Sequence, residues 1–102
     1  MSGHDRDLVF AALGDGHRRL LLDRLRRCNG QTLTSLADGL GITRQAVTKH
    51  LKQLELAGLV MTRRRGREKL HFLNPVPIDA VAMRWLRQFA ELPLEVLVPA
   101  RD

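Results

Sequence analysis

The sequence predicts a small, mainly α-helical (α+β) domain with one β-hairpin, in the order α-α-α-α-β-β-α, and three observations lead to this fold class. Apolar residues recur at spacings of three and four in five segments, which is the period of an amphipathic helix. Between the fourth and fifth segments, two short alternating stretches flank a glycine-containing loop, as in a hairpin. The length of 102 residues suits one domain, so we predict a single domain over residues 1–102.

The first part of the chain predicts three helices. Residues 6–13 and 16–27 carry the first two apolar patterns. Asp15 is placed to cap the second helix, because its carboxylate can accept hydrogen bonds from the free backbone amides of the first turn. A third helix, of about eight residues, is expected to begin after Thr32 as N-cap and to end at Gly41.

A fourth helix is predicted after a short connection that contains Gly41. It covers residues 44–57, with Thr43 placed to cap it. Small Ala37 lets the third and fourth helices approach each other, and Val47 fills the space between them. Two short helices around a tight glycine turn predict a helix-turn-helix, here over about residues 33–57.

The fourth helix has two different faces. One is predicted to face the core, and it carries Val47, His50, Leu51, Leu54 and Ala57. The opposite face carries donors that suit phosphate oxygens and base edges, namely Arg44, Gln45, Thr48, Lys49 and Lys52. We therefore expect this second face to bind double-stranded DNA.

A β-hairpin over about residues 59–73 is predicted next, with strands at 59–63 and 69–73. Gly66 in the connecting loop suits a turn that needs a positive φ. The tip carries arginines that can hold phosphate or enter a minor groove: Arg63, Arg64, Arg65 and Arg67. A hairpin of this kind directly after a helix-turn-helix predicts the wing of a winged helix-turn-helix.

The positive charge of the chain is localised. The whole sequence has 17 Lys and Arg against 11 Asp and Glu, a formal net charge of +6. Eight of these cations and two of these anions lie between Arg44 and Lys69, so this segment carries +6 and the remainder nine charges of each sign. A localised positive field is the footprint expected of a nucleic-acid binding surface.

A last helix is predicted over about residues 77–92. Its apolar stripe includes Ile78, Val81, Ala82, Trp85, Leu86 and Phe89. Two interpretations remain open, a core helix or one half of a homodimer interface. We favour the homodimer, because a thin monomer core would leave an aromatic stripe partly exposed and a symmetric pair doubles the DNA contacts. The apolar tail at 94–98 is compatible with either interpretation.

These segments together resemble the ArsR-type family of winged helix-turn-helix repressors over about residues 8–89. The residues that carry the resemblance are Ala12-Leu13-Gly14-Asp15, Arg18-Arg19-Leu20-Leu21, Leu36-Ala37, Leu40-Gly41-Ile42-Thr43, Ala46-Val47-Thr48-Lys49-His50-Leu51, Leu54, Ala57-Gly58-Leu59-Val60, Arg63-Arg64-Arg65-Gly66-Arg67, Leu70, Phe72 and Leu73-Asn74-Pro75. The resemblance implies a dimer that sits on an operator and blocks transcription until a signal lowers its affinity.

Many members of this family sense metals, but their usual ligands are missing from this sequence. A sulfur pair at the start of the third helix falls here on Thr32 and Thr34, whose hydroxyls cannot replace thiolates. The alternative site on the last helix finds Asp79 and Glu91 but no histidine after His71. We therefore predict no metal site, no metal inducer and no cofactor, and the effector is left open.

The remaining histidines and the cysteine are also given structural roles. No two of the four histidines stand three or four residues apart, and His50 is expected to be structural or to contact phosphate. Cys28, the single cysteine, is expected to be a small buried apolar residue, with a redox switch as the alternative. For Arg18 and Arg19, a phosphate contact and a solvated surface remain equal alternatives.

Two function classes remain after these exclusions. The sequence has no glycine-rich phosphate loop, no nucleophile with an evident base and no clustered carboxylates, so we predict that the protein is not an enzyme. It has no run long enough to cross a bilayer and no signal peptide, and we expect a cytoplasmic protein. The first class is a sequence-specific DNA-binding repressor, and the second a winged helix protein-interaction module without DNA activity. The localised positive charge favours the first.

Overall fold

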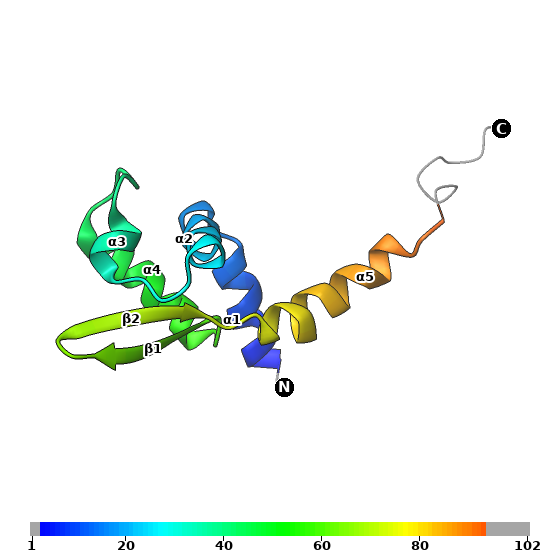
Figure 1. The fold of residues 1–102 in the computed structure, drawn as a ribbon. Helices are drawn as coiled ribbons and strands as arrows, with labels where there is room; N and C mark the ends of the chain where they lie inside the picture. Colours follow the sequence, from blue (N-terminus) through cyan, green and yellow to red (C-terminus); the bar gives the residue numbers. More distant parts are fainter. Residues whose placement is uncertain (1–2, 94–102) are drawn as a thin grey trace.

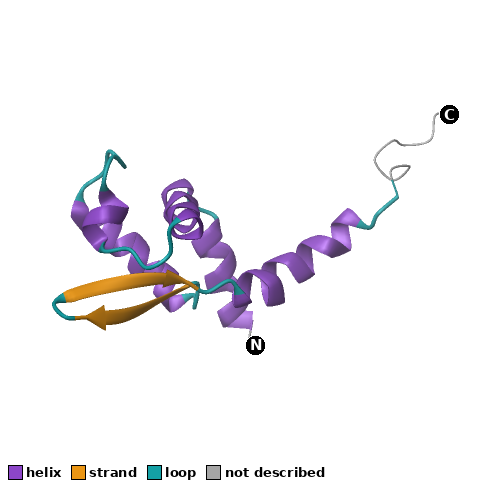
Figure 2. Cartoon of the chain, viewed as in Figure 1, coloured by secondary structure: helices purple, strands orange, loops and turns teal. Residues whose placement is uncertain are grey.

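The computed structural model describes residues 3–93, and the tail at 94–98 considered above lies outside them. Its elements are α1 (Gly3–Leu13), α2 (Gly16–Arg27), α3 (Leu33–Ala37), α4 (Arg44–Leu56), β1 (Val60–Arg65), β2 (Glu68–Leu73), a π-helical segment η1 (Ile78–Met83) and α5 (Arg84–Ala90). Figure 1 shows the first four helices in one body, with the hairpin and α5 extending from it in different directions. Figure 2 shows η1 and α5 as one continuous helix. The predicted fold class is confirmed.

The predicted N-caps are all present. Asp15 Oδ1 accepts hydrogen bonds from the backbone N–H groups of His17 and Arg18, at 2.9 and 3.1 Å. Thr32 Oγ1 accepts from the backbone of α3, and Thr43 Oγ1 accepts from the backbone of α4 at 3.1 Å. These bonds satisfy amides that have no partner within the helix, and so they fix where each helix begins.

The helix α3 is shorter than expected. It ends at Ala37 because Gly39 and Gly41 both adopt positive φ, at +71° and +73°, and the chain leaves the helix there. Arg24 of α2 stabilises this early end: its Nη1 donates to the backbone carbonyls of Leu36 and Asp38. The connection from α3 to α4 is therefore longer than the sequence pattern indicates.

The hairpin has longer strands than expected. Its antiparallel ladder runs from the pair Val60↔Leu73 to the pair Arg65↔Glu68, and only Gly66 and Arg67 form the loop. The predicted loop at 64–67 is thus wrong in part, since Arg64 and Arg65 lie within β1, as Arg63 does in agreement with the prediction. Gly66 has a φ of +62°, as the turn requires.

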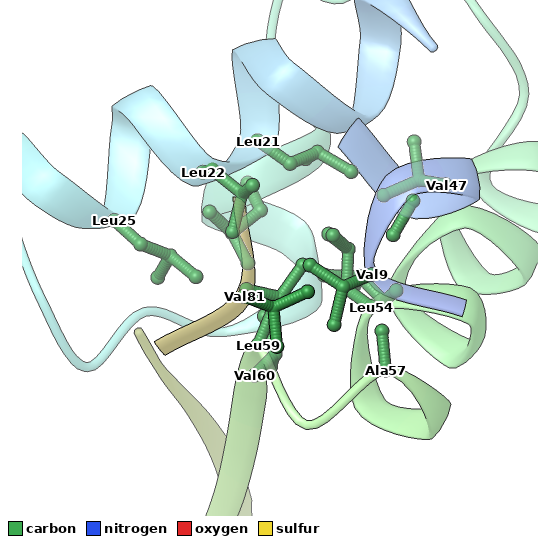
Figure 3. Packing of buried hydrophobic residues seen from close by; sticks show 13 residues of the cluster. Val9, Leu21, Leu22, Leu25, Val47, Leu54, Ala57, Leu59, Val60 and Val81 are labelled. Atoms are coloured by element: carbon green, nitrogen blue, oxygen red, sulfur yellow. The ribbon is translucent and has the colours of Figure 1, made fainter. Parts of the chain in front are cut away.

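The core lies between the first four helices and the start of the hairpin (Figure 3). Its most deeply buried side chains are Leu21, Leu25, Leu36, Leu54, Leu59, Val9 and Val47. The predicted core face of α4 is buried at Val47, Leu51, Leu54 and Ala57, whereas His50 is only half-buried. Cys28 is exposed rather than buried, because it is the C-cap of α2 and its extended backbone (φ −143°, ψ 96°) no longer follows the helix that carries Leu21 and Leu25.

The predicted stripe of the last helix divides into two parts. Val81 and Ala82 in η1 are buried, and η1 packs against α1. Figure 3 shows Val81 within the core cluster, beside Val9 of α1. Beyond η1 the stripe is uncovered: Trp85, Leu86 and Phe89 are 46 %, 48 % and 54 % exposed. One continuous helix therefore completes the core and then presents an apolar surface.

Candidate nucleic-acid interface

The helix α4 presents its polar face to solvent. All five predicted contact residues are exposed, namely Arg44, Gln45, Thr48, Lys49 and Lys52. The helix is held from the other side by Val47, Leu51 and Leu54, which are at most 3 % exposed. Because the buried face fixes the rotation of α4 about its axis, the polar residues point outward together.

A hydrogen bond connects α4 directly to α3. Arg44 Nη2 donates to Thr34 Oγ1 at 3.0 Å. This places the start of α4 against the first turn of α3, so the two helices of the helix-turn-helix are joined by a polar contact as well as by apolar packing. Arg44 is therefore partly restrained before any ligand binds.

A groove connects α4 with the hairpin. It has a volume of about 360 Å³ and contains side chains from α3, α4 and the loop end of the hairpin. Arg44 and Thr48 contribute from α4, and Arg67 and Lys69 from the hairpin. The two parts of the predicted DNA surface thus meet along one hollow, which their separation in the sequence does not reveal.

The exposed cations of the hairpin are arranged by its register. Arg64 lies opposite Lys69, Arg63 opposite Leu70, and Arg65 opposite Glu68. Glu68 is the only acidic residue between positions 59 and 73. Because Arg64 and Lys69 lie opposite each other, they concentrate positive charge near the tip. Two like charges at opposite ladder positions repel each other and destabilise the free hairpin.

Arg18 and Arg19 have structural partners. Arg18 donates from Nε to Ala12 O at 3.0 Å and from Nη2 to Ala11 O at 2.8 Å. Arg19 donates from Nη1 to Leu13 O at 2.8 Å. Both side chains satisfy carbonyls at the end of α1, a role that neither sequence alternative included. Arg18 also borders a shallow hollow with Lys49 and Lys52 of α4.

The positions of the family's usual metal ligands have other partners here. Thr32 caps α3, and Thr34 accepts a hydrogen bond from Arg44. Asp79 lies 3.6 Å from Arg87 in an exposed ion pair. Nothing in these contacts substitutes for the missing thiolates or histidines.

The fold brings Asp15, His17 and His50 together, and sequence spacing missed this cluster. The rings of His17 and His50 have centroids 5.7 Å apart, and His50 Nδ1 lies 3.9 Å from Asp15 Oδ1. Metal ligands that share one helix stand three or four residues apart, a spacing that the sequence itself reveals. These residues instead come from two helices that pack against each other in the hydrophobic core. The backbone hydrogen bond from Arg18, with smaller contributions from the charges of His50 and Arg18, lowers the pKa of Asp15 although partial desolvation opposes this.

In the part of the chain that the structure describes, none of the helices has both the length and the apolar character needed to cross a lipid bilayer.

Comparison with known proteins agrees with this geometry. The sequence model of a helix-turn-helix domain family matches residues 13–63. The uncharacterized HTH-type transcriptional regulator YuzN of Bacillus subtilis is 41 % identical over 92 residues, which cover 84 % of this chain and 99 % of that protein.

Several solved structures are similar as well. The ArsR-like transcriptional regulator from Rhodococcus sp. RHA1 has a TM-score of 0.77 and 36 % identity, covering 86 % of this chain and 80 % of that one. The homodimeric winged helix-turn-helix DNA-binding domain Mb0332 from Mycobacterium bovis has a TM-score of 0.67 and 22 % identity, covering 88 % of this chain and 83 % of that one. The fold, the exposed polar face of α4 and these relatives agree, and the chain belongs to the ArsR-type winged helix-turn-helix family of DNA-binding transcriptional regulators.

Proposed function

We propose that this regulator is a sequence-specific repressor that binds operator DNA as a homodimer. In this proposal Gln45, Thr48, Lys49 and Lys52 of α4 read the major groove. Arg63, Arg64, Arg65 and Arg67 of the hairpin hold the phosphate backbone or enter the minor groove. Arg44, which is already fixed on α3, contacts phosphate at the start of α4.

The single observation that carries this proposal is the shared groove between α4 and the hairpin. Residues that suit base edges and residues that suit phosphate meet there, at Arg44, Thr48, Arg67 and Lys69. The segment from 44 to 69 also carries the entire net charge of the chain. Glu55 and Glu68 also line the groove, so the positive charge belongs to the whole segment rather than to the hollow alone. A protein-interaction surface has no need of a segment so strongly positive, and this charge supports DNA as the ligand.

The homodimer is supported by the exposed apolar stripe of α5. Trp85, Leu86 and Phe89 form an uncovered surface on a helix that extends from the body (Figure 1). The similar domain from M. bovis is a homodimer, which agrees with this assignment. A twofold pair would place two α4 helices on half-sites roughly 34 Å apart.

Metal sensing through the usual family positions is not part of this proposal. Thr32 and Thr34 are engaged as a helix cap and as an acceptor for Arg44. A hydroxyl of ordinary acidity is a poor ligand for a soft metal. An inducing signal, if the protein has one, would therefore act elsewhere on the protein.

Selection of bound fragments from a random DNA pool, followed by titration of the selected duplex at several salt concentrations, tests the proposal. Substituting Arg64 and Arg65 by alanine should weaken binding to all duplexes alike and lower the salt slope by about one for each phosphate that is no longer neutralised. Arg26→Ala with Arg27→Ala is the matched control, because these exposed arginines at the end of α2 pair with Asp23 away from the groove.

Substitution of Gln45 or Thr48 by alanine should act differently. These variants should lose discrimination between the selected duplex and its base-substituted forms by roughly 1–3 kcal/mol, with little change in salt slope. If the pool yields no preferred sequence, or if the two pairs of arginine substitutions weaken binding equally, the assignment of α4 and the hairpin is wrong.

A further inference from the structure

Asp15, His17 and His50 each offer a ligand atom, and these atoms all lie within 4.8 Å of one another. Asp15 and His17 belong to the beginning of α2, and His50 lies in the middle of α4. The two imidazole rings are tilted by 33° with centroids 5.7 Å apart. The cluster is separate from positions 32, 34, 79 and 91, which correspond to the usual ligand positions of the family.

The donor set suits a transition metal rather than Mg²⁺ or Ca²⁺. Two imidazole nitrogens and one carboxylate oxygen are ligands for Zn²⁺ and its neighbours, with a water completing a tetrahedral site. Bonds of about 2.0–2.1 Å would bring the ligand atoms to about 3.3 Å from one another. The ligand atoms, now up to 4.8 Å apart, must therefore approach one another by as much as about 1.5 Å. The exposed His17 side chain can make most of this movement.

The carboxylate of Asp15 can serve the cap and the ion together. Both cap hydrogen bonds end on Oδ1, which is also the oxygen that lies 3.9 Å from His50 Nδ1, so an ion would share Oδ1 with the cap or bind Oδ2, whose lone pairs the cap leaves free. The pKa of this carboxyl is lowered, chiefly by the backbone hydrogen bond from Arg18, which keeps the group anionic. Imidazole nitrogens bind a metal only in the neutral form, and a negative carboxylate beside two of them stabilises a divalent cation.

Arg18 is the group that opposes an ion. Its Nη1 lies 3.4 Å from His50 Nδ1, so an ion bound to that nitrogen must replace the guanidinium there. The guanidinium is a rigid plane, so Nη1 cannot move away while Nε and Nη2 keep their hydrogen bonds to Ala12 O and Ala11 O. An ion on His50 Nδ1 would therefore have to turn the whole Arg18 head away from the end of α1.

We propose that Asp15, His17 and His50 form a binding site for one divalent transition-metal ion of the Zn²⁺ class. The ion joins the start of α2 to α4, and His50 also borders the hollow that contains Lys49 and Lys52 of the DNA-binding face. The metal site therefore lies beside the surface that we assign to DNA, and none of the three ligand residues belongs to that surface.

The test uses the full chain, stripped of metal and free of DNA, with Co²⁺ as a spectroscopic probe and Zn²⁺ as its competitor. We expect one equivalent of Co²⁺ per chain, with the absorption of a four-coordinate ion, and displacement by Zn²⁺. His17→Gln, His50→Gln and Asp15→Asn should each weaken binding at least about 10-fold, because even a residue that only orients a metal ligand is worth that much. His4→Gln is the matched control and should bind as the wild type does.

Thermal unfolding gives a second readout. Zn²⁺ should raise the Tm of the wild type and of His4→Gln, because a ligand that binds only the folded state stabilises it, and should leave the Tm of His17→Gln unchanged. His17 is exposed and Asn is a good N-cap, so at least two of the variants retain the fold. Equal Co²⁺ affinity in the wild type and these variants, or no stoichiometric binding, overturns the site. Neither result bears on DNA binding, which the experiment does not involve.

Discussion

Arg64 and Lys69 face each other directly across the hairpin, in the ladder of β1 with β2. Both side chains are exposed, and like charges at opposite ladder positions destabilise a hairpin by a few tenths of a kcal/mol. The neighbouring pair, Arg65 opposite Glu68, is of opposite charge. The pair Arg65 and Glu68 thus stabilises the hairpin by itself. The pair Arg64 and Lys69 becomes favourable only when an anion such as phosphate approaches.

Arg64→Glu should therefore stabilise the free protein while it weakens DNA binding. The introduced carboxylate would attract Lys69 across the ladder, and we expect the free energy of unfolding to rise by about 0.5 kcal/mol at low salt. Binding to DNA should fall because one cation is removed and one anion is introduced beside the phosphates. Chemical denaturation and duplex titration at the same ionic strength measure the two effects.

Arg65→Glu is the matched comparison. It makes the same change of charge one residue along β1, but there it faces Glu68, so the unfolding free energy should fall instead of rising. DNA binding should weaken in both variants. Equal changes in stability for the two variants would show that the register has no influence on these charges.

Two leucines of α4 test the packing of the helix that carries the DNA-binding face. Leu54 is fully buried, whereas Leu56 is 56 % exposed. Leu54→Ala should lower the free energy of unfolding by roughly 2–5 kcal/mol, because it leaves a cavity among side chains from several elements. Leu56→Ala should change it by less than about 0.5 kcal/mol. Urea denaturation distinguishes the two, and similar losses would contradict the burial of Leu54.

Most of the fold follows from local sequence signals. Apolar spacing places α2 and α4, and the side chains of Asp15, Thr32 and Thr43 mark where three helices begin. The end of α3 is less evident from the sequence, because Gly39 and Gly41 both adopt positive φ and the apolar pattern continues past the first of them. The full length of β1 is hidden for a different reason, since a run of charged residues has no inward alternation to reveal the ladder.

The site is less completely encoded in local patterns. The wheel of α4 correctly separates most of its buried face from its polar face, but nothing local indicates that Arg67 shares a groove with Arg44. In the same way, His17 and His50 approach only because α2 and α4 pack together. The exposure of Cys28 likewise depends on where α2 ends, because its backbone has already left the helix.

The carboxylate of Asp15 should make stability depend on pH in the acid range. Its pKa in the folded protein is lowered, chiefly by the hydrogen bond from the backbone of Arg18, so the unfolded chain takes up a proton first. The stabilisation from this group is complete above the ordinary carboxyl pKa. It is lost as the pH falls from about 4 through the lowered value.

Asp15→Asn isolates this effect, because asparagine caps a helix comparably but does not titrate. The wild type should be more stable than Asp15→Asn at pH 6, and this difference in unfolding free energy should shrink on acidification. The other carboxyl groups are the same in both proteins, so their contributions cancel in the difference. Unfolding measured between pH 6 and pH 2 checks this. A difference that stays constant, or that grows toward acid, would contradict the lowered pKa.

Trp85 is the residue that most directly tests the homodimer. Its ring contacts Phe10 of α1 edge-on, with centroids 5.4 Å apart, and its centroid lies 4.6 Å from that of Phe89, yet it is still nearly half exposed. Trp85→Asp should give folded monomers, because a charge in a desolvated apolar interface cannot be compensated there. Arg87→Asp changes the same helix on the side away from the stripe, and its exposed pair with Asp79 contributes little, so this variant should stay dimeric. Sedimentation equilibrium measures both. A Trp85→Asp protein that remains dimeric would place the interface on another surface, and the roughly 34 Å spacing of half-sites would then have to be derived from that surface instead.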